Sequence, residues 1–225
     1  MVGEGRLMDK TEKRMTNHDI YTLLFDRIIQ NAYPEETWLR EDLLAREFNV
    51  SRSPVRSVLR NLEQDHLIEI LPKRGARVFP FTADDLEDIY ELRQALEQLA
   101  LKRAANSLSI QKLLELKAQI IALKEVADPA AHAAVDSTLH SYLIRSSGRR
   151  RLVLMLDQLY RLTQTFRELS LGSGESQTAT VAEHLELVDA LCIRDIDKAL
   201  GILDRHIENS KIRVLTRLID GKMHD

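Results

Sequence analysis

Three arginines in residues 49–64 recur at one helical spacing. Arg52, Arg56 and Arg60 lie at i, i+4 and i+8, so a helix would present all three on one face. A guanidinium can donate two hydrogen bonds to O6 and N7 of guanine, and a good pair discriminates between bases by about 1–3 kcal/mol. Because an α-helix fits the major groove, this face predicts contact with DNA. The alternative is a solvated charged surface on which Arg60 pairs with Glu63.

The second half of the chain carries four side chains of the types that ligate metal ions. Asp136 and His140 lie at i and i+4, whereas His184 and His206 lie in later apolar stretches. Imidazole nitrogen and carboxylate oxygen are ligands that Zn²⁺ and related ions accept. A single histidine in an apolar stripe is more often a core residue, so the spacing alone leaves both interpretations open.

Apolar spacing predicts the helix that carries the arginines. Ser51 can cap this helix, and Pro54 then falls in the first turn, where its missing N–H costs nothing. Its buried face is predicted to consist of Val55, Val58, Leu59 and Leu62. Two helices are expected before it, at 18–30 and 40–48, with inward-facing side chains at Ile20, Leu23, Leu24, Ile28, Ile29, Leu43, Leu44 and Phe48. Residues 31–38 are expected to form a turn between these two helices.

A basic hairpin is predicted after the third helix. The β-rich runs 67–71 and 76–80 flank a turn in which Gly75 can adopt a positive φ. Lys73, Arg74 and Arg77 give this hairpin its positive charge. Three helices and a hairpin within 16–80 predict a winged helix-turn-helix, preceded by a flexible N-terminus at 1–15.

From residue 81 onward the pattern is helical throughout. Thr82 and Asp85 have the spacing of a capping box. Six helices are predicted, at 83–106, 109–126, 129–147, 150–170, 178–193 and 195–220. The segment 170–177 is expected to be a loop. The predicted fold class is therefore mainly α, with an N-terminal winged helix-turn-helix and an all-α, six-helix antiparallel bundle at 81–225.

Composition agrees with this division. The chain has 225 residues, of which 44% are hydrophobic and 30% charged, enough to bury a core. Residues 49–80 carry a net charge of +3 and residues 81–225 a net charge of −3, which favours a local contact with a polyanion. One cysteine, no apolar run of membrane length and no signal-peptide pattern predict a cytoplasmic protein without a membrane contact.

The run "LLAREFNVSRSPVRSVLRNLEQDHLIEILPKRGARV" resembles the DNA-binding domain of GntR-superfamily regulators. The resemblance implies double-stranded DNA as partner. It assigns the DNA contacts to Ser51, Arg52, Ser53, Arg56, Arg74 and Gly75, and Arg60, on the same helical face, is a further predicted contact. In one departure, Asp42 stands where many members of the FadR branch carry an arginine. An acid cannot make that contact, although Arg40 or Arg46 can replace it in part.

The later segments "DSTLH", "EHLELVDALCIRDID" and "RHI" resemble the FCD domain of the FadR subfamily. The resemblance implies that 81–225 is an effector-binding and dimerisation domain with a divalent ion on Asp136, His140, His184 and His206. Zinc is expected, with nickel or manganese as alternatives. Leu139 and Arg149 depart from the family pattern without changing the ligand set. His132, four residues before Asp136, competes with His140 as a ligand.

The resemblance also implies an effector site in the helical domain. A metal with open positions attracts a small carboxylate or hydroxy acid. Arg93 and Asn209 are the predicted effector contacts, although Arg93 can equally form a structural ion pair with Glu97. Weaker candidates are Arg161, Thr163, Gln164 and Arg167.

The sequence therefore predicts a transcription regulator, a repressor, that binds a palindromic operator as a homodimer and is not an enzyme. An organic acid held at the metal would control its DNA affinity. In a second hypothesis the metal ion itself is the signal, and in a third the metal centre is a hydrolase. The third lacks a paired general base, because Glu183 is expected to point to a neighbouring helical face.

Overall fold

The computed structural model describes residues 15–33, 37–72, 74–79 and 81–222, without the side chains of 164, 165, 168, 169 and 218–222. The predicted flexible segment 1–15 lies outside these residues except for Met15, and so does Lys73 of the hairpin. The chain divides into two compact units, Met1–Phe81 and Thr82–Asp225. Within the described part, none of the helices is both long enough and apolar enough to traverse a lipid bilayer.

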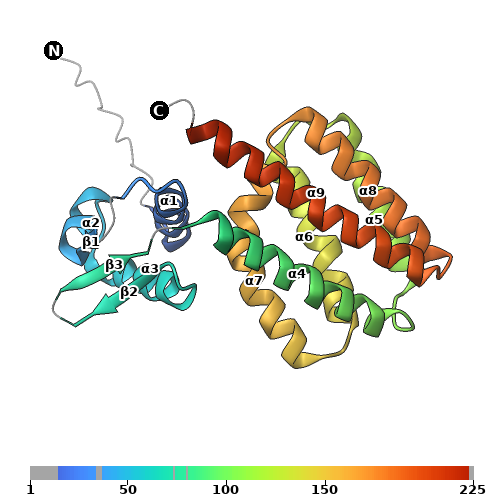
Figure 1. Ribbon diagram of the computed structural model, residues 1–225, viewed down its shortest axis with the longest axis horizontal. Helices are drawn as coiled ribbons and strands as arrows, with labels where there is room; N and C mark the ends of the chain where they lie inside the picture. Colours follow the sequence, from blue (N-terminus) through green and yellow to red (C-terminus); the bar gives the residue numbers. More distant parts are fainter. Residues whose placement is uncertain (1–14, 34–36, 73, 80, 223–225) are drawn as a thin grey trace, which may run out of the picture. The chain divides into compact units, whose positions relative to one another are not determined.

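Among its described residues, the first unit contains three helices and a small sheet, which Figure 1 labels. Its helices are α1 (Asn17–Ile29), α2 (Glu41–Glu47) and α3 (Arg52–Gln64). Helices α1 and α2 both pack against α3. The core between them is apolar and includes Ile20, Leu24, Phe25, Ile28, Leu44, Phe48, Val55, Val58, Leu59 and Leu62. The predicted winged helix-turn-helix is thus confirmed.

Three short strands form the wing: β1 (Trp38–Leu39), β2 (Ile68–Leu71) and β3 (Gly75–Val78), in the order β1-β3-β2. Both pairings are antiparallel. Gly75 has a φ of 109°, and a Cβ there would lie 2.7 Å from the carbonyl oxygen of Leu39. The predicted positive φ is therefore confirmed, and only glycine fits at this position, where β3 pairs with β1.

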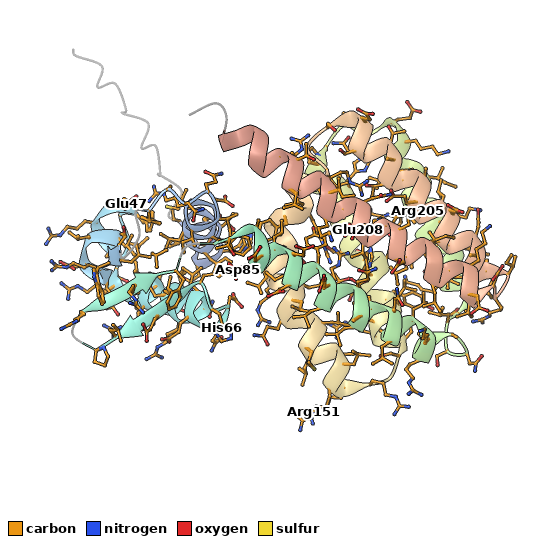
Figure 2. All side chains as sticks on the ribbon, viewed as in Figure 1. Glu47, His66, Asp85, Arg151, Arg205 and Glu208 are labelled. Atoms are coloured by element: carbon orange, nitrogen blue, oxygen red, sulfur yellow. The ribbon has the colours of Figure 1, made fainter. Side chains whose placement is uncertain are left out.

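The second unit is built from helices, and Figure 1 shows α9 beside α4 and α8. Its six α-helices confirm the predicted bundle: α4 (Ala83–Ala104), α5 (Ile110–Ala122), α6 (Pro129–Ser146), α7 (Arg150–Ser170), α8 (Gly174–Cys192) and α9 (Ile196–Lys222). The predicted capping box begins α4, where the Thr82 N–H donates to the carboxylate of Asp85, which Figure 2 labels at the start of the helix.

Several predicted details are wrong. Trp38, expected in a turn, lies in β1, and Leu43, expected inside, is 50% exposed because α2 buries Leu44 and Ala45 instead. The helix expected at 109–126 ends at Ala122, and a 3₁₀ turn, η1 (Leu123–Glu125), follows it.

Helix α8 also begins four residues before its predicted start. The Ser173 hydroxyl caps the backbone N–H of Ser176, and the Gln177 amide donates to the carbonyl of Leu171. These contacts make helix of most of a segment whose glycines and serines predicted a loop.

Candidate metal centre and nucleic-acid interface

Helix α3 presents the predicted polar face to solvent. Arg52, Ser53, Arg56 and Arg60 are exposed, whereas the apolar positions between them are buried. Ser51 occupies the N-cap position, but its hydroxyl makes no capping hydrogen bond, so it is not committed to the helix end. The exposed first turn is therefore open to a ligand at its positive dipole end.

The arginines of this face are not equally available. Arg56 donates from Nε and Nη2 to the carboxylate of Glu41 at 2.9 and 2.8 Å. The hydrogen bond from Arg56 lowers the pKa of Glu41, and the charges of Arg52 and Arg60 lower it further. Three guanidinium groups thus act on one carboxylate.

Glu63, which the alternative interpretation pairs with Arg60, makes a different contact. The Glu63 carboxylate accepts from the backbone N–H of Ile70 at 2.9 Å, which ties α3 to β2. Glu63 Oε1 is therefore engaged with the backbone of β2 and does not pair with Arg60. Arg52 and Arg60 remain on the exposed face of the helix.

The wing and the second helix add further charged groups. Arg74 is exposed beside Gly75, whereas Arg77 pairs with Glu69 at 3.0 Å and lies against the ring of Phe79. Arg40 pairs with Asp42 at 3.2 Å. A cation therefore lies beside Asp42, the acid that stands where many members of the FadR branch carry an arginine. A duplex that approaches this face would meet Arg74 more readily than Arg77.

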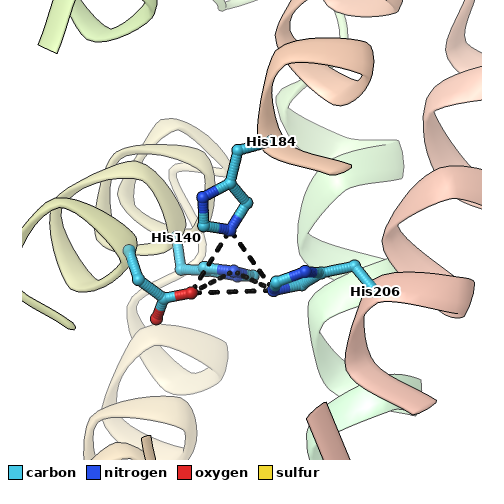
Figure 3. Close-up of side chains that lie close together, drawn as sticks. His140, His184 and His206 are labelled. Atoms are coloured by element: carbon cyan, nitrogen blue, oxygen red, sulfur yellow. Dashed lines mark hydrogen bonds and ion pairs between the residues drawn. The ribbon is translucent and has the colours of Figure 1, made fainter. Parts of the chain in front are cut away.

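In the helical unit, the four predicted metal ligands lie together. The ligand atoms of Asp136, His140, His184 and His206 are all within 4.8 Å of one another, and all four residues are buried. Asp136 Oδ1 is 3.5, 3.3 and 3.6 Å from the Nε2 atoms of the three histidines in that order. Figure 3 shows the three rings converging from separate helices, α6, α8 and α9.

These distances fit a metal ion. The Nε2 atom of His206 lies 3.1 Å from that of His140 and 3.4 Å from that of His184. In a tetrahedron of ligands about 2.0–2.1 Å from zinc, neighbouring donor atoms are about 3.3 Å apart. Five of the six distances between the four buried donor atoms are 3.1–3.6 Å and the sixth is no more than 4.8 Å, a spacing that suits a divalent cation.

Two carboxylates fix the orientation of His140 and His206 by contacting Nδ1 of each imidazole, while Nε2 faces the centre of the cluster. Nδ1–H of His140 donates to Glu97 at 2.5 Å, and Nδ1–H of His206 donates to Glu183 at 2.7 Å. Each contact leaves Nε2 unprotonated and directed at the centre, as metal-binding histidines require. Glu183 also accepts from the Asn209 amide at 2.7 Å and from Arg213. The predicted effector contact Asn209 therefore lies against the carboxylate that orients His206.

The electrostatics favour an ionised Asp136. Burial raises the pKa of Asp136, but the charges of His140 and Arg167 outweigh it and leave that pKa well below its usual range. Burial lowers the pKa of His140, but Glu97 and Asp136 outweigh it and raise that pKa, so a metal ion would have to displace a proton from His140. Burial lowers the pKa of His184 to about 4, and the neighbouring His206 adds to the effect. An ionised carboxylate and a neutral imidazole are the forms in which these residues ligate metals.

His132 does not join the cluster. Its Nε2–H donates to the carbonyl of Val126 at 2.8 Å, and the four clustered ligand atoms do not include it. The sequence left His132 and His140 as alternatives because each lies four residues from Asp136, one before it and one after it. The carbonyl contact turns His132 toward η1.

The buried Arg93 and Arg167 and the half-buried Tyr160 complete the surroundings of the centre. Arg93 donates from Nε to Glu97 at 2.6 Å, which is the structural ion pair that the sequence allowed. Tyr160 donates to the same carboxylate at 2.5 Å, and the guanidinium of Arg167 lies 3.9 Å from the Tyr160 ring centroid. Arg167 Nε is 3.3 Å from Asp136 Oδ2. A recess of about 580 Å³ between α6 and α7 is lined in part by Arg167 and Tyr160.

Sequence reasoning missed Glu97, Glu183 and Tyr160 as parts of this centre. Glu183 was expected to point to a neighbouring helical face, yet it orients His206 from 23 positions away. Neither acid has a spacing to its histidine that a single helix would reveal. Only the spacing of Arg93 and Glu97 at i and i+4 could have indicated a buried pair.

An exposed arginine helix in a winged helix-turn-helix, joined to a helical unit with a buried ligand cluster, is the plan of a DNA-binding transcription regulator. Residues 16–78 match the bacterial regulatory proteins of the gntR family, and residues 88–209 match the FCD domain. The chain belongs to the GntR family, with the domain arrangement of its FadR subfamily, and it is a transcription regulator, not an enzyme.

Similar proteins agree with this assignment. A probable D-xylose utilization operon transcriptional repressor from Paenarthrobacter nicotinovorans is 30% identical over 208 residues, covering 89% of this chain and 91% of that protein. The structure of Lar, which controls the expression of the Listeria monocytogenes agr system, has a TM-score of 0.70 at 19% identity and covers 92% of this chain and 99% of its own.

A second solved structure concerns the helical unit. It is titled as the metal-free FCD domain of TM0439, and it covers 62% of this chain and 98% of its own. Its TM-score is 0.54 and its identity 22%, so it supports the fold of the helical unit.

Proposed function

We propose that this regulator is a repressor whose operator affinity is controlled by a small organic acid at a metal centre in the helical unit. The observation that carries the proposal is the convergence of Asp136, His140, His184 and His206 in a buried site. Two of the histidines are held by carboxylates in the tautomer that a metal needs. A metal-free core would have no reason to direct three imidazole lone pairs at one another.

Zinc is the proposed ion, with nickel or manganese as alternatives. Three neutral imidazoles and one carboxylate would leave it a charge near +1 and would give an incoming carboxylate or hydroxy acid a Lewis acid to bind. Asp136 and the three histidines would hold the ion, while Glu97 and Glu183 would orient the histidines. The metal-free title of the TM0439 domain supports a metal in this fold, and the name of the D-xylose relative supports repression.

The hydrolase hypothesis loses its candidate base. The Glu183 carboxylate accepts from His206, Asn209 and Arg213, and these donors outweigh burial and lower its pKa to about 2. A carboxylate held in this way is a poor proton acceptor near neutral pH.

The proposed DNA contacts are Ser51, Arg52, Ser53, Arg56, Arg60, Arg74 and the backbone at Gly75. The exposed arginines would read base edges in the major groove, and Arg74 would reach the backbone or the minor groove from the wing. Because its target is chromosomal DNA, we expect the protein to act in the cytoplasm.

A homodimer is the proposed form on DNA. Large apolar side chains are exposed on two helices that pack against each other, Leu92 and Leu99 on α4 and Leu154 and Met155 on α7. Such a patch suits a second copy of the chain. Two recognition helices one turn of DNA apart, about 34 Å, would read the half-sites of a palindromic operator.

The proposal is tested by measuring operator affinity with the metal and the acid varied separately. A duplex selected from random sequences by the zinc-loaded protein provides the operator. We expect an organic acid to change its affinity in the zinc-loaded protein and to have no effect after the metal is removed with a chelator. If zinc alone changes operator affinity and no acid changes it further, the protein is a metal sensor and the organic-acid effector is rejected.

A further inference from the structure

Two buried arginines beside the metal centre have N–H groups with nothing to bind. Arg93 is 1% exposed and Arg167 is 3% exposed. Among the described residues, no hydrogen-bond partner lies at Nη1 or Nη2 of Arg93, or at Nε or Nη2 of Arg167. A buried charged donor without a partner is costly. Because Arg167 Nε faces Asp136 Oδ2 at 3.3 Å, the donors open to an anion are Nη1 and Nη2 of Arg93 and Nη2 of Arg167.

Both guanidinium groups flank the same ring. The guanidinium carbon of Arg93 lies 5.4 Å from the Tyr160 ring centroid, and that of Arg167 lies 3.9 Å from it. Asp136 Oδ2, next to Arg167 Nε, is also without a hydrogen-bond partner. The guanidinium of Arg167 therefore lies beside the carboxylate that faces the metal centre, and that of Arg93 is linked to the centre through Glu97, which accepts from His140.

The charges of the buried groups indicate how much negative charge is missing. Arg93 pairs with Glu97 and Arg167 lies against Asp136, so these four side chains are neutral as a set. Glu183 and Arg213 likewise cancel. A divalent ion with neutral imidazoles would then leave a net charge of +2 inside the bundle. A ligand with a single negative charge would neutralise half of it, and a dianion all of it.

An open recess reaches Arg167 from outside the bundle. The recess of about 580 Å³ between α6 and α7 is lined by Tyr160 and Arg167, with Ser137, Ser141 and the exposed Arg145 among its other walls. Its volume is in the range of small-molecule sites. A ligand in this recess would contact Arg167, whose Nε lies 3.3 Å from Oδ2 of the metal-site carboxylate Asp136.

We propose that the effector is a diacid, with one acid group at the metal centre and a second against the free N–H groups of Arg93 and Arg167. This inference rests on the proposed function, because it requires a metal-dependent organic-acid effector. It goes further in naming the charge of the ligand and in assigning Arg167 as a residue that determines specificity. A bidentate guanidinium contact favours a carboxylate or phosphate over a neutral group.

Matched pairs of acids test the proposal without knowledge of the natural ligand. Lactate and malate differ mainly by one carboxylate, and so do glycerate and tartrate. The affinity of each acid for the zinc-loaded wild-type protein is measured by calorimetry, with the zinc content checked after dialysis. We expect the diacid of at least one pair to bind about 10-fold or more tightly than its partner.

Two variants locate the preference. Arg167→Gln should reduce the ratio of diacid to monoacid affinity to about 3-fold or less. Because Asp136 loses its contact with Arg167 in this variant, both affinities are measured on protein with full zinc occupancy. Arg145→Gln removes an equal charge from the rim of the recess, where Arg145 pairs with Asp157, and should keep the ratio. The comparison on wild-type protein needs no variant, so a folding defect in Arg167→Gln does not remove the test.

The outcomes separate this inference from the proposed function. Equal affinities within both pairs would reject the diacid and leave an organic-acid effector standing. A ratio unchanged in Arg167→Gln would reject the role of Arg167. If none of the four acids binds the zinc-loaded protein, the organic-acid effector itself is rejected, and the diacid with it.

Discussion

The arginine face of α3 and the histidine cluster of the helical unit solve opposite physical problems. The face exposes its functional side chains and buries only the apolar positions between them. The cluster buries its functional side chains and must hold each one with a partner from another helix, such as Glu97 on α4 for His140 on α6. On α3 the functional side chains contribute little to the stability of the fold. In the cluster, the contacts that hold the functional side chains also stabilise the fold.

This difference predicts how each region responds to substitution. Exposed charges contribute little to stability, so changes on α3 should alter DNA binding alone. A buried polar group that loses its partner is costly, so changes in the cluster should alter metal binding and stability together. The following variants test this contrast, from the largest expected effect to the smallest.

The largest effect is expected for a metal ligand. Structural zinc sites bind with about 10–16 kcal/mol from four ligands, so His140→Ala should weaken zinc binding by at least about 100-fold. It should also lower Tm, because Glu97 loses a donor. Competition with a zinc chelator measures the affinity. His132→Ala is the control and should leave it unchanged, since His132 contacts the Val126 carbonyl; loss of zinc binding in His132→Ala alone would contradict the assigned ligand set.

A smaller effect is expected at the DNA face. Arg52→Ala should weaken binding to the selected operator by about 30-fold, equivalent to about 2 kcal/mol for a lost base contact. Its Tm should change by no more than about 1 °C, because the side chain is exposed. Fluorescence anisotropy gives the affinity and calorimetry the Tm. Operator affinity equal to that of wild type would refute the DNA role of this face.

An orienting carboxylate should have an intermediate effect on the metal. Glu183→Gln keeps the size of the side chain but removes the negative charge of the carboxylate that accepts a hydrogen bond from His206 Nδ1–H. We expect zinc affinity to fall by about 10-fold, as for other partners of metal-binding histidines. Glu186→Gln, on the same helix and paired with the exposed Arg205, is the matched control. Equal zinc affinities in the two variants would mean that Glu183 does not orient the ligand.

The smallest effect should strengthen binding. Glu41→Gln releases Arg56 from its bidentate ion pair and removes a negative charge beside the arginine face. Operator affinity should rise by about 2- to 3-fold at low salt, with less gain at high salt, because exposed pairs are worth less than about 1 kcal/mol and are screened. A titration at two salt concentrations measures this. Weaker binding in Glu41→Gln would mean that the ion pair positions Arg56 for the duplex.

The same contrast explains what the sequence could and could not predict. The apolar spacing of Val55, Val58 and Leu62 sets the inner face of α3, and the arginines on its other side follow from the same period. Gly75 was predictable because one backbone conformation demands it. Local patterns sufficed wherever one element carries both the buried and the functional residues.

The surroundings of the cluster could not be predicted in this way. Glu97 and His140 are 43 positions apart, and Tyr160 reaches Glu97 from 63 positions away. No period within one helix encodes such contacts, because they depend on how helices from distant parts of the chain pack. The sequence also could not predict that N–H groups of Arg167 lack a hydrogen-bond partner, because this depends on which side chains pack around them.

The central claim is that the buried histidine cluster controls the exposed arginine helix. It is tested most directly by titrating the selected operator with zinc-loaded wild type and with His140→Ala, each with and without the tightest-binding acid. We predict that the acid changes wild-type affinity by at least about 5-fold, within the usual range of coupling between sites, and changes that of His140→Ala by less than about 2-fold. Wild-type affinity that is the same with and without the acid would contradict the account.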